Sequence, residues 1–186
     1  IDILKKLRFD FSSISPDIDE TPFEKEAPKD LAMRLAKEKN LSIAKNNPDA
    51  LVIGSDQVAI CNKLILDKPL TKEKAIEQLL WQRGKNTEFF TALAVGLRSE
   101  KKLNVTFVKS TVKYLGDELI SDDDIVNYVV KEQPFFCAGS AKFEGIGISL
   151  IQKISCEDPN ALLGLPVIKL CQILNEWGIA PMSLIK

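Results

Sequence analysis

Apolar residues recur at helical spacing in several segments of the chain. Each segment begins with a residue that suits a first helical turn, either a proline at the first position or a side chain that caps the N-terminus. The pattern predicts helices over residues 28–45, 71–84, 121–131 and 166–178, after the end of a further helix at residues 1–7. In the last of these helices the apolar residues lie on one stripe, which indicates packing against a core.

Runs of apolar and β-branched residues, separated by polar turns, predict the strands. The clearest opens on Leu51, Val52 and Ile53 and continues to Ile60. Further strands are predicted at residues 9–14, 88–97, 103–115 and 148–154, and the polar turn SEKK joins the second and third of these four as a hairpin. Because helices and strands alternate early while a hairpin lies in the middle, we expect an α/β fold with a mixed sheet flanked by helices.

Length and charge narrow the class of protein. A chain of 186 residues with 45% hydrophobic and 27% charged residues fits one globular domain, residues 1–186, without disulfide staples. A net charge of −1 provides no broad basic surface, so we expect neither a nucleic-acid partner nor a membrane partner. No apolar run approaches the roughly 20 residues that span a bilayer, and no signal peptide is evident, which favours a soluble cytoplasmic protein.

The chain contains no histidine, and this excludes Ser-His triads and most transition-metal sites. The four cysteines are far apart and form no C-x-x-C pair, so reduced thiols are the expected state. Any catalysis must therefore depend on carboxylates, lysines and a hard metal ion.

Two charged residues interrupt apolar patterns. Asp56 follows the run 51–53 within one strand, where an unpaired carboxylate would be unfavourable. It is either a functional acid or a strand-end acid that faces solvent, and we favour the first because ligands bind at strand ends in α/β folds. Lys39 lies on a helical stripe with Ala32, Ala36 and Ile43. It either extends along the apolar surface to water or reaches an anion, and without further information the first is favoured.

Acidic residues gather in two places. Asp17, Asp19 and Glu20 lie within four residues of a predicted turn, where they either hold Mg²⁺ or Mn²⁺ or are solvated turn residues. The run 122–124 lies in the first turn of a helix, and there the acids complement the helix dipole.

A series of motifs is more specific than any single residue. In order, the chain contains PDIDETP, RLAKEK, VIGSDQV, LDKPLT, CAGSAKFEGIGISL and DPNALLGLP. The series resembles the Maf family of septum-formation-inhibitor-like proteins, over nearly the whole chain from about Leu4 to about Pro181. The resemblance implies a Maf/ITPase-like fold with a cleft between two lobes, and activity as a nucleoside triphosphate pyrophosphatase in nucleotide metabolism.

Two positions are similar to the branch that acts on 7-methylguanosine triphosphate. Gln57 stands in SDQV and Glu144 in FEG, where the branch acting on dTTP and UTP typically has threonine and glutamine. A carboxylate suits a methylated guanine, because that ring is cationic and offers N–H donors. The resemblance therefore implies that Gln57 and Glu144 select the base.

The resemblance also implies the catalytic roles. Asp56 would activate water as a general base, and Glu20 would help hold the metal or orient the water. Lys39 and Lys68 would contact the triphosphate. A divalent cation, Mg²⁺ or Mn²⁺ bound through Asp56 and Glu20, would bridge phosphate oxygens, and the products would be a nucleoside monophosphate and pyrophosphate.

One family motif is missing from this chain. Family members normally begin with a strand and a loop of the form A-S-x-S-P-x-R, which supplies serines and an arginine to the phosphates. The sequence starts within the helix that follows that loop, either because it is truncated or because the protein is a degenerate member. We therefore expect the 186-residue chain to be weakly active or inactive by itself.

Two further hypotheses concern partners. The alternative to an enzyme is a non-catalytic nucleotide-binding regulator of cell division, which the missing loop favours somewhat. A homodimer that uses Trp81 or Trp177 is an alternative to the commoner fate of a helical tryptophan, packing in the core.

Overall fold

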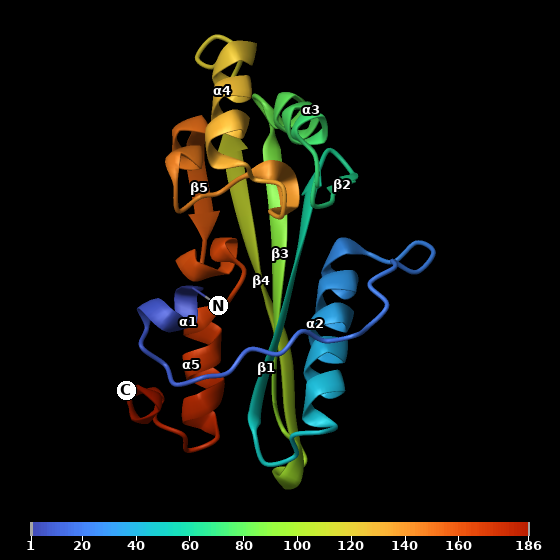
Figure 1. Ribbon diagram of the computed structural model, residues 1–186, viewed down its shortest axis with the longest axis vertical. Coiled ribbons are helices and arrows are strands. Elements are labelled where there is room, and N and C mark those ends of the chain that lie inside the picture. The colour runs from blue at the N-terminus through green and yellow to red at the C-terminus, as the bar shows by residue number, and fades with distance from the viewer. Residues whose placement is uncertain (1, 186) are drawn as a thin grey trace. The chain divides into compact units, whose positions relative to one another are not determined.

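The computed structural model describes residues 2–185 (Figure 1). Within that range the helices are α1 (Asp2–Lys6), α2 (Pro28–Ala44), α3 (Lys72–Gln82), α4 (Asp122–Glu132) and α5 (Val167–Glu176). The strands are β1 (Leu51–Cys61), β2 (Leu64–Leu66), β3 (Asn86–Leu97), β4 (Lys102–Tyr114) and β5 (Ile151–Cys156). Short 3₁₀ turns occupy residues 98–100, 138–140, 146–150, 159–163 and 181–184.

The strands form one five-stranded sheet in the order β2-β1-β3-β4-β5. The outer pairs are antiparallel: β1 pairs with β2 through Ala59 and Leu66, and β4 pairs with β5 through Ser110 and Cys156. The expected α/β class is confirmed, as is a sheet accompanied by helices.

The chain divides into two compact units, and the long strands pass from one to the other. The first unit comprises residues 1–56, 91–108 and 158–186, and the second comprises residues 57–90 and 109–157. That the whole chain acts as a single domain stays a prediction.

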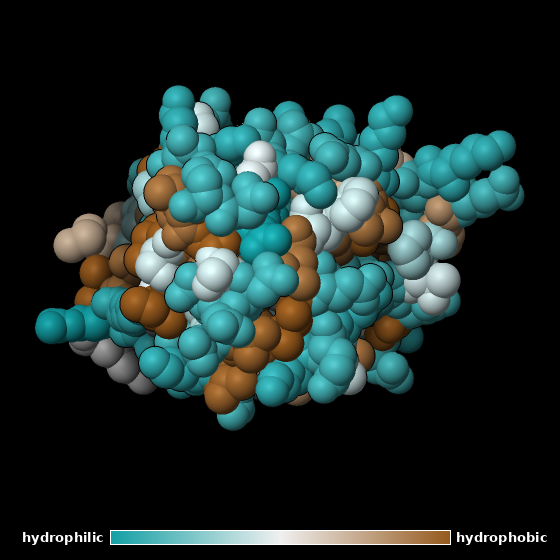
Figure 2. Space-filling view, turned by 90° about the horizontal axis from the view of Figure 1, so that it is seen from above, coloured by the Kyte–Doolittle hydropathy of each residue, from teal (hydrophilic) through white to brown (hydrophobic). Residues whose placement is uncertain are grey.

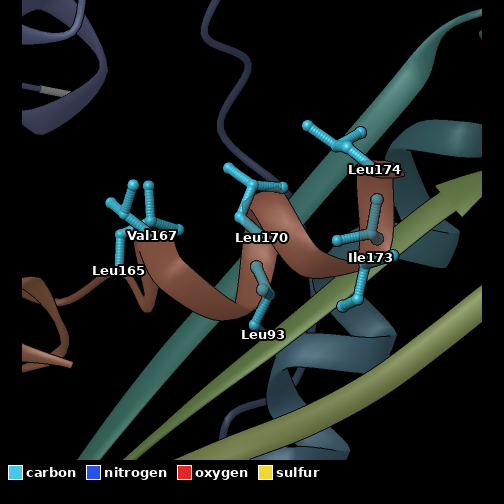
Figure 3. Packing of buried hydrophobic residues seen from close by; sticks show 7 residues of the cluster. Leu93, Leu165, Val167, Leu170, Ile173 and Leu174 are labelled. Carbon is cyan, nitrogen blue, oxygen red and sulfur yellow. The ribbon is translucent and has the colours of Figure 1, made fainter. Parts of the chain in front are cut away.

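In the first unit, alternate residues of β3 face different helices. Leu93 and Val95 belong to a buried apolar cluster with residues of α5, and Figure 3 shows Leu93 next to Leu170. Ala94 and Gly96 instead contact the side chain of Asn40 in α2. Because successive strand residues point to opposite faces, this part of the sheet lies between two helices. All residues from 91 to 96 are consequently buried.

In the second unit, α3 and α4 pack together, and a buried polar network joins α3 to two loops. Gln78 donates from Nε2 to the carbonyl of Asp67 at 2.9 Å and accepts from the hydroxyl of Ser140 at 2.5 Å. Gln82, which is fully buried, donates to the carbonyl of Gly139 at 2.7 Å. These bonds tie the LDKP and AGS segments to one helix.

Most predicted helix ends are confirmed. Ser121 and Asp124 form the predicted capping box, and Thr71 caps α3 by accepting from the amide of Lys74. The hairpin of β3 and β4 also forms, with Lys101 in the left-handed region at its turn.

Three expectations were wrong: one strand, the start of another, and the place of Asp56 within its strand. Residues 9–14 form no strand, because only Phe9 pairs, in an isolated bridge with Ile185, while most of the side chains that follow are exposed. β5 begins at Ile151 rather than at residue 148, since residues 146–150 wind into a 3₁₀ turn. Asp56 lies in the middle of β1, not at its end, because the strand continues to Cys61.

One face of the molecule carries mainly polar residues. On the face that Figure 2 shows, hydrophilic residues cover most of the area and hydrophobic residues form patches between them. Among residues 2–185, no helix is both long enough and apolar enough to cross a membrane.

Candidate active site

Close packing of α2 on β1 places the central residues of the site. Ala32, Ala36, Asn40 and Ala44 recur every four residues along α2, and all are buried. Opposite them, Gly54 has no side chain, and a β-carbon there would overlap the carbonyl oxygen of Ala36 and lie 2.8 Å from the amide nitrogen of Asn40. The small residues let the helix approach the strand closely, so that the neighbouring Lys39 reaches across to β1.

Lys39 joins two carboxylates that come from distant parts of the sequence. Its Nζ lies 2.6 Å from Oδ1 of Asp56 in β1 and 2.7 Å from Oε1 of Glu20 in the turn before α2. The Lys39 and Asp56 side chains retain only 15% and 13% of their exposure, whereas that of Glu20 retains 49%. The three predicted residues of the first unit are thus brought together. Lys39 reaches anions, and the simpler prediction that it extends to water was wrong.

The ammonium group of Lys39 is held in its charged form. Burial alone would lower the pKa of Lys39, but hydrogen bonds and charge attraction from Asp56 and Glu20 outweigh it and raise that pKa above its ordinary value. Lys39 therefore stays positive throughout the neutral range and offsets part of the charge of both carboxylates.

The acidic turn has a defined structure. Oδ1 of Asp19 accepts from the amide of Thr21 at 2.9 Å. A hydrogen bond with the Thr21 side chain and then this amide bond lower the pKa of Asp19. Of the three clustered acids, Asp19 therefore stabilises the turn by a local hydrogen bond, while Glu20 contacts Lys39.

The DPNALLGLP motif has a structural explanation in the first unit. Asp158 is almost fully buried, and its carboxylate accepts from the amides of Asn160 at 3.2 Å and Ile168 at 2.6 Å. Asp158 therefore accepts from a backbone amide in the first turn of α5. The N-cap residue of that helix, Pro166, has no side-chain acceptor of its own. The hydroxyl of Ser55 lies 2.8 Å from the carbonyl of Gly164, which connects the same motif to β1.

The other three predicted residues, Gln57, Lys68 and Glu144, belong to the second unit. Gln57 is half-buried in β1, while Lys68 and Glu144 are exposed. Lys68 lines a groove of about 850 Å³ with residues of β2 and α3. The pKa of the Cys137 thiol is raised first by burial and then by the charge of Glu144, whereas Lys142 and Lys68 oppose this. Lys68 and Glu144 therefore both lie near Cys137.

The donor set suits a hard divalent cation. Glu20 and Asp56 direct carboxylate oxygens toward one point, at present the Lys39 ammonium, and Mg²⁺ usually takes one or two carboxylates together with substrate phosphates. Within residues 2–185 no group of three or more His, Cys, Asp or Glu side chains is placed to hold a metal by itself. A metal here would need oxygens from the substrate or from water.

Sequence reasoning missed the residues that support this site. Arg34 and Gln78 lie on helices, where charged and amide residues are common, and Glu26 lies in an irregular segment, so none of the three carries an unusual local pattern. Gly54 offered the one readable signal, a glycine within a strand, which often marks a close approach of another backbone.

Comparisons with known proteins agree on one group. The family model described as Maf-like protein matches residues 1–177. A protein of Aliivibrio fischeri named 7-methyl-GTP pyrophosphatase is 43% identical over 178 residues, which cover 96% of this chain and 91% of that protein. A protein of the same name from Aromatoleum aromaticum is 46% identical, with 95% and 90% covered. A third, from Nitrosospira multiformis, is 44% identical, with 96% and 88% covered.

Proposed function

Because the chain belongs to the family of Maf-like proteins, we propose that it is a nucleoside triphosphate pyrophosphatase acting on a modified nucleotide, 7-methyl-GTP. The products are the nucleoside monophosphate and pyrophosphate. The observation that carries the proposal is the contact of the Lys39 ammonium with both Asp56 and Glu20. It gathers a general base, a second carboxylate and a cation in one place, without any histidine.

In the proposed reaction Asp56 takes a proton from the attacking water as the water oxygen bonds to the α-phosphorus. The bond from that phosphorus to the α–β bridging oxygen breaks, and pyrophosphate leaves with the electron pair. Glu20 orients the water, and Lys39 and Lys68 offset the negative charge that builds on the phosphate oxygens. A divalent cation held by Asp56 and Glu20, Mg²⁺ or Mn²⁺, would supply Lewis-acid stabilisation of the same charge.

Base selection is proposed for Gln57 and Glu144. The relatives named 7-methyl-GTP pyrophosphatase support this choice of nucleotide. A methylated guanine carries positive charge, and the exposed carboxylate of Glu144 attracts it more strongly than a neutral base.

The test is pyrophosphate release from a nucleotide panel that includes 7-methyl-GTP and GTP, with Mg²⁺ or Mn²⁺. The 186-residue chain is assayed beside a version that carries a family-type A-S-x-S-P-x-R segment at its N-terminus. Turnover with 7-methyl-GTP preferred supports the proposal. No release from any nucleotide by either folded protein overturns it, and nucleotide binding without release then favours the regulator hypothesis.

The variant Asp56→Asn separates chemistry from folding. Asparagine keeps an oxygen that accepts from Lys39 but cannot take a proton, so turnover falls by about 10²–10⁴-fold while the protein stays folded. Retained turnover in this variant rules out Asp56 as the general base.

A further inference from the structure

We propose that Arg34 is a positioning residue, which holds the acidic turn on α2 so that Glu20 meets Lys39 and Asp56. Neither the motif resemblance nor the proposed mechanism gives Arg34 a role. The inference rests on the proposed function only for its kinetic consequence, since the arrangement itself can be measured without turnover.

The guanidinium group of Arg34 makes four hydrogen bonds. Three of them bind residues 21–26, the segment that connects the acidic turn to α2. Nε and Nη2 donate to the two carboxylate oxygens of Glu26 at 2.7 and 2.9 Å, in the paired geometry that only arginine provides. Nη2 also donates to the carbonyl oxygen of Thr21 at 3.0 Å. Thr21 directly follows Glu20, so this bond fixes the backbone next to the catalytic carboxylate.

The partners of Arg34 make further contacts within the same segment. Oε2 of Glu26 also accepts from the amide of Phe23 at 3.0 Å, and the guanidinium carbon lies 4.0 Å from the centre of the Phe23 ring. Residues 21–26 are therefore held at both ends and in the middle, although no helix or strand includes them.

The pair of Arg34 and Glu26 is better shielded than a usual surface ion pair. Their side chains retain 16% and 9% of their exposure, while Glu20 itself retains 49%. Glu20 lies on an irregular segment, so the position of its carboxylate depends on the anchored residues beside it as well as on its contact with Lys39. Arg34 and Lys39 are five positions apart on α2, so the guanidinium group and the ammonium group are carried by one rigid helix.

The kinetic test uses Arg34→Lys and Arg34→Gln, because neither residue can make the paired bonds to Glu26. Displacing a reacting group by about 1 Å costs roughly 100-fold in rate, so we expect kcat to fall about 10- to 100-fold with KM changed less than threefold. Glu26→Gln should lower kcat in the same direction. The matched control is Glu38→Gln, which removes the charge from the acceptor of the fourth bond of Arg34, at 3.2 Å. It alters no contact of Arg34 with residues 21–26 and should keep kcat within about twofold.

A double-mutant cycle distinguishes positioning from general destabilisation. If Arg34 acts through Glu20, the variant Arg34→Lys/Glu20→Gln is no slower than Glu20→Gln alone. If the two losses multiply instead, Arg34 acts independently of Glu20 and the proposal is wrong.

Amide hydrogen exchange tests the anchor without any turnover. In Arg34→Lys and Arg34→Gln, exchange at Thr21 and Phe23 should accelerate at least tenfold while the core amides of α2 stay protected. Unchanged exchange at both amides overturns the proposal whatever the activity. Accelerated exchange in a protein that hydrolyses no nucleotide keeps the anchoring role and rejects the proposed function instead.

Discussion

Lys39 has two anionic partners in the folded protein, and removing it would leave them facing each other. Asp56 is the more buried of the two carboxylates, so its charge is destabilised more than that of Glu20 when the ammonium group is removed. The side chains of Lys39 and Asp56 retain 15% and 13% of their exposure. Exposed ion pairs contribute little to the free energy of unfolding, whereas breaking a buried pair is strongly destabilising, and we expect an intermediate effect here.

We therefore expect Lys39→Met to lower the free energy of unfolding by about 1–3 kcal/mol, measured by urea denaturation. Adding Asp56→Asn should restore part of the loss, because one of the two facing charges disappears. Lys74→Met is the control: its partner Glu77 is 69% exposed, and the loss should stay within about 0.5 kcal/mol. Equal losses in the two lysine variants would show that the contacts of Lys39 contribute nothing to stability.

The anchor of the acidic turn should weaken in acid. The hydrogen bond from Arg34, followed by that from the Phe23 amide, outweighs burial and lowers the pKa of Glu26 below its ordinary value of 4.5. A lowered pKa stabilises the fold fully above 4.5, and this contribution is lost as the pH falls through the lowered value.

The expected result is that the wild-type chain and Glu26→Gln differ in unfolding free energy by a constant amount from about pH 7 to about 5, with convergence at lower pH. Chemical denaturation across this range measures the difference. A difference that persists undiminished to about pH 3 would show that Glu26 does not titrate against Arg34 in this way.

At the scale of elements, the contact of α2 with β1 has little room for change. The small size of the α2 alanines and of Gly54 allows this contact, since larger side chains at these positions would separate helix and strand. Lys39 and Asp56 lie on those two elements, so their 2.6 Å contact depends on this close packing.

Gly54→Ala should therefore destabilise the protein by about 1–3 kcal/mol and lower kcat, because the new methyl group forces the backbone of α2 away. Thermal unfolding and steady-state kinetics measure the two effects. Gly178→Ala is the control: its positive φ of 76° makes alanine strained, but the added carbon meets nothing within 4 Å. That variant should lose stability without losing kcat, and a Gly54→Ala variant that keeps full kcat would contradict the link between packing and catalysis.

For the whole molecule, the three charged residues that meet at Lys39 and the residues proposed for base selection fall in different units of the chain. Glu20, Lys39 and Asp56 belong to the first unit, whereas Gln57 and Glu144 belong to the second. On the proposed function, substitutions in the first set change turnover of every nucleotide alike, while substitutions in the second change the order of preference.

Glu144→Gln should accordingly reduce the ratio of kcat/KM for 7-methyl-GTP to that for GTP by about tenfold, which corresponds to about 1.4 kcal/mol of lost attraction for the cationic ring. Glu157→Gln, an exposed acid of the same unit, controls for net charge and should leave the ratio unchanged. A ratio that is unaffected in Glu144→Gln would remove this residue from base selection.

The sequence predicted the elements of this molecule better than its supporting contacts. Caps and periodicity placed the main helices because they are local signals, visible within a few residues. The contact of Lys39 with Asp56 spans 17 positions, and for Lys39 alone the pattern favoured the wrong alternative. Arg34 opens the RLAKEK motif, but its role could not be recognised, since that role depends on an irregular turn whose path no local pattern specifies. For residues 9–14 the local pattern predicts a strand, but a strand also needs a neighbour to pair with. Only Phe9 has one, in its isolated bridge with Ile185.

The arrangement around Lys39 also has a consequence for the thermodynamics of ligand capture. A lysine side chain carries about 2 kcal/mol of rotamer entropy, which a free surface lysine would lose at the moment it contacts an anion. Here Asp56 and Glu20 already restrict the ammonium group before any nucleotide arrives, so that loss occurs during folding. On the proposed function, the protein therefore binds the triphosphate with a preorganised cation, and binding avoids the entropic penalty of ordering this side chain.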